Sequence, residues 1–217
     1  MAELATTSFG VLNRAFTVAW THGDWMAWNL VLAVVPLALA AALFRPHLRR
    51  TGLWWAGVVT FVAFLPNAAY VITDVVHLFD DIRGTSSDLV LLGIHVPLYL
   101  LFFTVGFGSY VAALELTRRY TRAEAPGARW SVLELGLHVL CAAGIYLGRV
   151  VRLNSWEILT RPRAVITGIS WLAGLAPVAL VGCTAVVLIG LTMIVRALAW
   201  SAADAVAQVR LRLPPAS

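Results

Sequence analysis

The stretch that decides the fold is LAGLAPVALVGCTAVVLIGLTMIVRALAW, residues 172–200. It is longer than the roughly 20 apolar residues that a helix needs to cross the hydrocarbon layer of a bilayer. Trp171 precedes the stretch and Trp200 closes it. Tryptophan favours the boundary between lipid and water because its ring is apolar and its N–H is polar. The stretch therefore predicts a transmembrane helix.

Four more apolar runs precede this one, at about 26–44, 53–73, 89–115 and 131–151. The chain has 217 residues, of which 60% are hydrophobic and only 12% are charged, which leaves too little polar surface for a soluble domain. We expect an all-α fold: a polytopic membrane helix bundle with five transmembrane helices, forming one domain over residues 1–217.

The two ends of the chain are less apolar than the five runs. Residues 1–24 show no pattern of a removable signal peptide, and their apolar residues recur at helical spacing. This pattern predicts a helix that lies in the membrane interface, with a disordered terminus as the alternative. We expect residues 201–217 to form a tail.

The distribution of arginine predicts an orientation. All 16 cationic side chains are Arg. Arginines follow the first and third runs, whereas aspartates follow the second, and cytoplasmic loops carry the excess of positive charge. We expect a multi-pass protein of the bacterial cytoplasmic membrane, with the N-terminus outside and the C-terminus inside. Alternation then places the acidic segment 74–88 and the basic segment 149–163 on the same, outer side, although the basic segment departs from the charge rule.

The same composition excludes some chemistry. Because the chain has no lysine, it cannot form the Schiff base that retinal or pyridoxal phosphate requires. Arginine at loop ends is typical of membrane proteins, so the basic balance does not indicate nucleic acid. Cys141 and Cys183 lie inside predicted spans, where packing is a better interpretation than redox or metal chemistry.

Prolines interrupt several of the runs. Pro66 is followed by Asn67, and a proline inside a helix frees a carbonyl and bends the axis. We expect the clearest helix break at this pair. Residues 164–175 would form either a re-entrant half helix or the start of the last span.

Polar residues recur along one face of three runs. Helical spacing puts Glu134, His138, Arg149 and Arg152 on one face of the fourth run. Ionisable groups inside a membrane turn toward partners or water. One interpretation is a pathway lined by His95, Glu134 and His138; the other is helix packing through buried ion pairs. The second and third runs carry similar faces, with Asn67, Tyr70, Asp74, His77 and Asp81 on one and Asp88, His95, Tyr99 and Tyr110 on the other.

A metal site is the disfavoured alternative. Asp74 with His77, and Glu134 with His138, have spacings at which a carboxylate and an imidazole can bind one ion. However, His95 and His138 should differ in depth by about 10 Å, and arginines near the outer carboxylates oppose a divalent cation. We therefore expect no metal, and the sequence indicates no particular cofactor.

The basic segment suits an anionic group. Arginine presents a planar fork of donors that matches phosphate or carboxylate, and Trp156 offers a flat apolar surface. An anionic lipid headgroup would fit there. In the alternative, Arg149 and Arg152 pair with Asp74 and Asp81 as structural salt bridges.

Two segments carry a resemblance to a known family. PNAAYVITDVVHL at 66–78 and GIYLGRVVRLNSWE at 144–157 resemble the signature segments of a bacterial membrane-protein family known as a domain of unknown function. The chain departs from the family pattern with Ala69 in place of a proline and Glu157 in place of an aspartate. The resemblance supports one outer group of residues and implies no particular reaction.

Three functions follow as hypotheses. In the first, the protein recognises or modifies an anionic lipid-like ligand at an outer polar pocket, with Asp74 and His77 transferring a proton. The second is an ion or solute transporter or channel subunit, and the third a non-catalytic scaffold. Membrane lipids and an anionic amphiphile are the expected partners, nucleic acid is not, and self-association stays open. The expected ligand-binding residues are Asn67, Tyr70, Arg149, Arg152, Asn154, Trp156 and Glu157.

Overall fold

The computed structural model describes residues 2–85, 88–152, 160, 161, 163, 167, 170 and 174–212, with side chains described from residue 23 to residue 208 within these ranges. This part of the chain is helical and contains no strand. Its elements, in chain order, are α1 (Ala2–Leu43), α2 (Gly52–Tyr70), the 3-10 turn η1 (Val71–Asp74), α3 (Val75–Gly84), α4 (Asp88–Val90), the π turn η2 (Leu91–His95), α5 (Val96–Glu124), α6 (Trp130–Arg149) and α9 (Leu175–Arg212).

The described residues contain five helical stretches that are long and apolar enough to span a membrane. This confirms the predicted all-α fold. The stretches are Gly23–Leu43, Gly52–Gly84, Asp88–Glu124, Trp130–Arg149 and Leu175–Gln208. Residues 2–22 are helical and continue α1 without a break. α9 extends to Arg212, so most of the predicted tail is helical as well. The orientation and the interfacial position of the N-terminal segment stay predictions.

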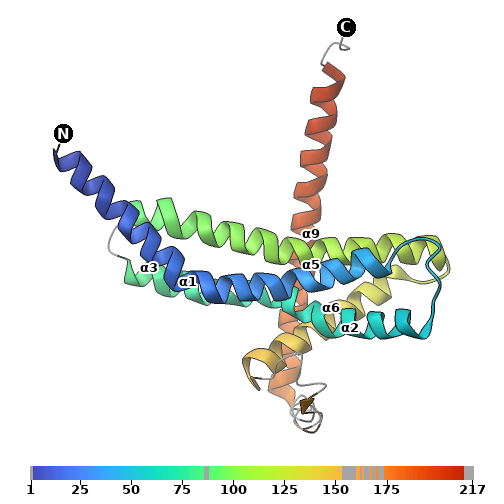
Figure 1. The fold of residues 1–217 in the computed structure, drawn as a ribbon. Helices are drawn as coiled ribbons and strands as arrows, with labels where there is room; N and C mark the ends of the chain where they lie inside the picture. The colour runs from blue at the N-terminus through green and yellow to red at the C-terminus, as the bar shows by residue number, and fades with distance from the viewer. Residues whose placement is uncertain are drawn as a thin grey trace.

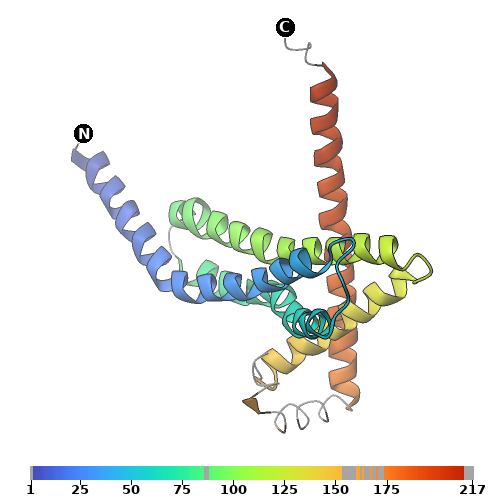
Figure 2. The same ribbon diagram turned by 45° about the vertical axis from the view of Figure 1, so that its right-hand side comes forward.

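The helices form two sets with different directions. α1 packs along α2 and α5, and α6 packs against α2 and α9. Figures 1 and 2 show α1, α2 and α5 lying beside one another, whereas α9 crosses them instead of joining their row. Since α9 packs chiefly on α6, most of its apolar surface is exposed, as is typical of a helix in contact with lipid.

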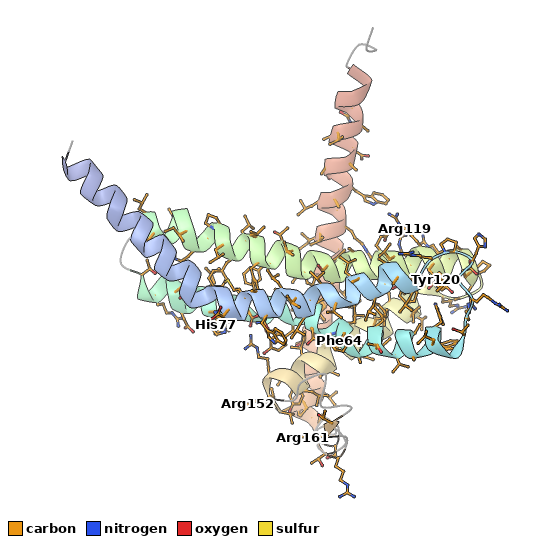
Figure 3. All side chains as sticks on the ribbon, viewed as in Figure 1. Phe64, His77, Arg119, Tyr120, Arg152 and Arg161 are labelled. Carbon is orange, nitrogen blue, oxygen red and sulfur yellow. The ribbon has the colours of Figure 1, made fainter. Side chains whose placement is uncertain are left out.

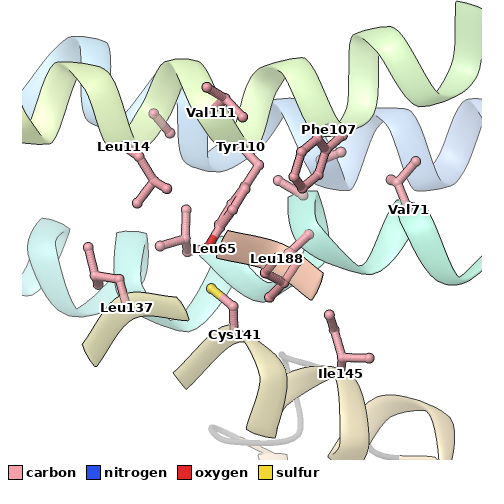
Figure 4. Packing of buried hydrophobic residues seen from close by; sticks show 14 of the residues in the cluster. Leu65, Val71, Phe107, Tyr110, Val111, Leu114, Leu137, Cys141, Ile145 and Leu188 are labelled. Carbon is pink, nitrogen blue, oxygen red and sulfur yellow. The ribbon is translucent and has the colours of Figure 1, made fainter. Parts of the chain in front are cut away.

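Two close helix contacts depend on glycine. A Cβ on Gly106 of α5 would lie 2.7 Å from Val71 Cγ1, and a Cβ on Gly144 of α6 would lie 2.6 Å from Pro66 Cβ. Small residues allow helix backbones to approach closely in membranes, where packing replaces the hydrophobic effect as the main attraction. The helices also share a buried apolar core that includes Leu65, Tyr110 and Leu188, shown in Figure 4.

The helix break lies one turn later than expected. Pro66 is inside α2, which remains helical to Tyr70, and the change of geometry occurs in η1. Asn67 Nδ2 donates to the carbonyl of Phe64 at 3.1 Å, within the same helix. α2 therefore continues through Pro66 and ends four residues later. The 3-10 turn then places Asp74 in the bundle interior.

Candidate ligand-binding site at the end of α6

Asp74 is the centre of the polar group at this end of the bundle. It ends η1 and is 2% exposed. One carboxylate oxygen, Oδ1, forms an ion pair with Nη2 of Arg149, and the other, Oδ2, accepts a hydrogen bond from Asn29 Nδ2 at 3.2 Å. A buried carboxylate is stable only when it is paired and hydrogen-bonded. Asp74 therefore links α1, η1 and α6.

Arg149, the last residue of α6, is held on three sides. Its Nε donates to Thr73 Oγ1 at 2.9 Å, and its guanidinium carbon lies 4.6 Å from the centre of the Tyr70 ring. Thr73 is itself fixed, since its hydroxyl donates to the Tyr70 carbonyl at 2.7 Å. The Arg149 side chain is nevertheless 35% exposed. The contacts with Thr73 and Asp74 take two of the five N–H groups of its rigid fork.

Aromatic and acidic side chains adjoin this group. The ring of Trp25 lies 4.9 Å from that of His77 and 5.5 Å from that of Phe102, measured between centroids. The Tyr99 hydroxyl donates to Asp81 Oδ2 at 2.8 Å. His77 is exposed at the surface of α3, so its imidazole is reachable from outside while its ring rests against Trp25.

Arg152 follows α6 at the same end. Its backbone has a φ of 61°, which turns the chain sharply after the helix, and its side chain is exposed. In Figure 3, Arg119 and Tyr120 lie toward one end of the bundle and His77 toward the other, with Arg152 beyond the last turn of α6. The predicted ligand-binding residues Asn154, Trp156 and Glu157 lie outside the described residues and stay predictions.

The structure thus brings several of the predicted residues together: Tyr70, Asp74 and Arg149 are in contact. His77 follows Asp74 by three residues, and Arg152 follows Arg149 by three. Asn67 is close in sequence, but its amide bonds to the backbone of its own helix. The salt bridge between Asp74 and Arg149 is one that the alternative interpretation predicted, whereas Asp81 bonds to Tyr99.

A second polar group lies near the start of α6. Glu134 Oε1 is 2.6 Å from Nη2 of Arg196 in α9, and 3.9 Å from Nε2 of His138. The other imidazole nitrogen of His138, Nδ1, is 2.7 Å from the Tyr110 hydroxyl of α5. Fifteen residues of helix, about 22 Å, separate Glu134 from Arg149. The two polar groups are therefore at opposite ends of α6.

Apolar packing separates these two groups. Ile145 lies between them on α6 and belongs to the core with Leu65 and Leu188. His95, the third predicted pathway residue, has its Nδ1 3.3 Å from the Val90 carbonyl and lies just before α5, whereas Tyr110 lies in the middle of that helix. The face that the sequence showed as one polar stripe is thus two polar groups with an apolar layer between them.

Two polar contributors, Asn29 and Arg196, were not expected from the sequence. Both are isolated polar residues inside apolar runs, which is the signal that could have found them. Thr73 lies inside the segment 66–78 that carries the family resemblance. As for metals, no group of three or more His, Cys, Asp or Glu residues in the described part of the chain is arranged to hold an ion.

Comparison with known proteins gives the family. The model of the family described as "Protein of unknown function (DUF1361)" matches residues 28–195. The chain belongs to this family. The DUF1361 region includes both ends of the Asp74–Arg149 contact and ends one residue before Arg196. No curated protein and no solved structure matches the chain. The predicted membership of a family of unknown function is confirmed, whereas the bacterial origin and the signature segments stay predictions.

Proposed function

We propose that this multi-pass membrane protein recognises an anionic, lipid-like ligand at the end of α6. The observation that carries the proposal is the state of Arg149: Asp74, Thr73 and Tyr70 fix its guanidinium, and yet its side chain is 35% exposed. A fork that is already oriented loses little entropy when it binds an anion. Its free N–H groups would bind phosphate or carboxylate oxygens.

Charge supports an anionic ligand. Asp74 neutralises Arg149 only on its buried side, and the exposed Arg152 adds a second guanidinium at the same end. In partly dry surroundings, charge-assisted hydrogen bonds from arginine are about twice as strong as neutral ones. The ligand would place its anionic group against the two arginines and its acyl chains along the apolar helix surfaces.

The geometry favours recognition over catalysis by Asp74. This carboxylate is buried and already bonded to Arg149 and Asn29, so its role in the proposal is to orient Arg149. His77 is exposed and would be the proton-transfer residue if the ligand is also modified. Asn67 and Tyr70 would act as supports for the turn and for the guanidinium.

A structural clasp is the second candidate, and one observation favours it. The contact of Arg149 with Asp74 joins residues 75 positions apart and ties α6 to η1. If this is its whole role, Arg149 matters for stability alone. A transporter is less well supported, because apolar side chains, including Ile145, separate the two polar groups along α6.

Arg152 separates recognition from a clasp, because it is exposed and none of the described residues forms an ion pair or hydrogen bond with it. The full chain would be placed in nanodiscs of phosphatidylcholine with a minor share of phosphatidylglycerol, and retained lipid counted by native mass spectrometry. We expect Arg152→Ala to lower phosphatidylglycerol retention without lowering the thermal midpoint. The matched control is Arg122→Ala, an exposed arginine near the end of α5.

The outcomes are distinct. Loss of the anionic lipid in Arg152→Ala but not in Arg122→Ala supports recognition at the end of α6. Equal retention in the wild type and Arg152→Ala, together with a lowered thermal midpoint in Arg149→Ala, would leave only the clasp.

A further inference from the structure

The polar group at the start of α6 has the composition of a proton site. It combines a carboxylate, an imidazole, a phenol and a guanidinium from three helices: Glu134 and His138 of α6, Tyr110 of α5 and Arg196 of α9. His138 is 3% exposed and Tyr110 is fully buried, whereas Glu134 keeps 15% of its side chain exposed. The exposed fraction of the side chain therefore decreases in the order Glu134, His138, Tyr110.

We propose that Glu134 and His138 together bind one exchangeable proton, held either on Oε1 of the carboxylate or on Nε2 of the imidazole, two atoms that lie 3.9 Å apart. A hydronium ion in the adjoining water would supply the proton and become water. One O–H or N–H bond forms, at Glu134 or at His138, and no covalent bond of the protein breaks. The site is separate from the end of α6 where Arg149 lies, and the proposal does not depend on lipid recognition.

The Tyr110 hydroxyl makes two protonation states compatible with one geometry. Its oxygen is 2.7 Å from Nδ1 of His138. A hydroxyl can donate to this nitrogen when the nitrogen is bare, or accept from it when it carries a hydrogen. The contact is therefore kept whether or not His138 is charged, so proton uptake does not leave a buried polar atom unpaired on this side.

Arg196, the third charged member of the group, disfavours protonation of Glu134. Its Nη2 lies 2.6 Å from the same Glu134 oxygen that faces His138, so it favours the ionised carboxylate. An ionised Glu134 in turn favours the imidazolium. With Glu134 ionised and His138 neutral, the formal charges of Glu134 and Arg196 cancel, and one added proton makes the group cationic.

Several further polar and charged side chains lie around the group. From α5, Tyr110 and Arg118 face the group, and Arg118 interacts with Glu134 while it is paired with Glu115. From α6, the Cys141 thiol lies beside the Tyr110 hydroxyl. From α9, Thr192 lies one helical turn before Arg196. Thr192 is 1% exposed, and no group in the described part of the chain forms a hydrogen bond with its hydroxyl. This hydroxyl is therefore a further polar atom, near Arg196, that could form a hydrogen bond.

The test is nitrogen NMR of the histidine rings in the full chain, carried in micelles and titrated with pH. The chain has five histidines, and His138→Gln identifies the signals of interest. In Glu134→Gln, which removes the negative charge and keeps the shape, we expect the proton affinity of His138 to fall about tenfold or more. The matched control, Glu124→Gln, alters a glutamate that pairs with Arg50 at the end of α5 and should leave His138 unchanged.

Tyr110→Phe is the second variant, and its measurement is the tautomer of neutral His138. Loss of the hydroxyl should change which ring nitrogen carries the hydrogen in neutral His138, while the signal of the exposed His77 stays as it was. The proposal is overturned if His138 does not titrate between about pH 4 and pH 9 (a window of roughly two and a half units on either side of the usual histidine value). It is also overturned if Glu134→Gln and Glu124→Gln titrate alike.

Discussion

The guanidinium of Arg149 lies over the ring of Tyr70, 4.6 Å from its centre, while its nitrogen atoms reach the two residues that end the same turn, Thr73 and Asp74. One side chain of α6 thus contacts three residues of a five-residue segment. This arrangement makes the stability of the turn depend unequally on the two charged partners.

Arg149→Ala should destabilise the protein more than Asp74→Asn. Without Arg149, the buried Asp74 carboxylate keeps only Asn29, and an unpaired buried charge costs about 3 kcal/mol or more. In Asp74→Asn the arginine still reaches water and Thr73, so the expected loss is about 1 kcal/mol. Unfolding in detergent with increasing dodecyl sulfate measures both values. Equal losses would contradict the asymmetry.

Exchanging the two charges tests their coupling. If the contact itself stabilises the turn, the double variant Asp74→Arg, Arg149→Asp should be more stable than the sum of the two single changes predicts. Strict additivity in the same unfolding assay would show that each residue acts through other neighbours. Lipid retention measured on the same samples separates this role from ligand binding.

Gly106 and Gly108 of α5 form a matched pair. A Cβ on Gly106 would lie 2.7 Å from Val71 Cγ1, whereas one on Gly108 would meet nothing within 4 Å. Valine is branched at Cβ and cannot turn away easily, so Gly106→Ala should push η1 off α5 and cost about 1–3 kcal/mol. Gly108→Ala should be neutral or stabilise the helix by up to about 1 kcal/mol. The difference between the two unfolding free energies is the measurement.

The sequence predicts those features of the structure that depend on one segment and the bilayer alone. Apolar length predicted all five spans, because a helix in lipid must be long and apolar whatever its neighbours are. The grouping of Asp74 with Arg149 followed from alternation of the spans, which needs no knowledge of packing. Both inferences depend on the thickness and the apolar interior of the bilayer, which do not depend on how the helices of this protein pack.

What the sequence did not predict depends on pairs of helices. Periodicity showed the polar face of α6 as one stripe, but it does not show that Ile145 packs into a core between the two polar groups. Arg196 is a single charge in an apolar run of the sequence. Its partner, Glu134, follows only from the way α9 crosses α6 in the structure. The break lies a turn after Pro66, and the packing of Gly144 of a distant helix on the proline ring is likewise a contact that the sequence pattern does not show.

Tyr99→Phe should cost about 1 kcal/mol, since it removes the 2.8 Å hydrogen bond to Asp81 Oδ2 and keeps the ring that packs against Trp25. The control is Tyr146→Phe in α6, a partly buried tyrosine whose hydroxyl has no hydrogen bond to the described residues. Thermal midpoints of the two variants in the same detergent give the comparison. A larger loss in Tyr146→Phe would contradict the assignment of the bond.

Gly144→Ala tests the contact between α6 and the Pro66 ring of α2, close to the site. Its Cβ would lie 2.6 Å from Pro66 Cβ and 2.7 Å from Pro66 Cγ, and a proline ring has almost no freedom to move aside. The substitution should therefore push α6 away from α2, cost about 1–3 kcal/mol, and loosen the contact of Arg149 with Asp74 five residues further along α6. Gly136→Ala, in the same helix with nothing within 4 Å of its Cβ, is the control. Crosslinking between cysteines introduced at Thr73 and Val150 reports the spacing of η1 and the end of α6. Equal crosslinking yields in the two variants would show that the Pro66 contact does not position the site.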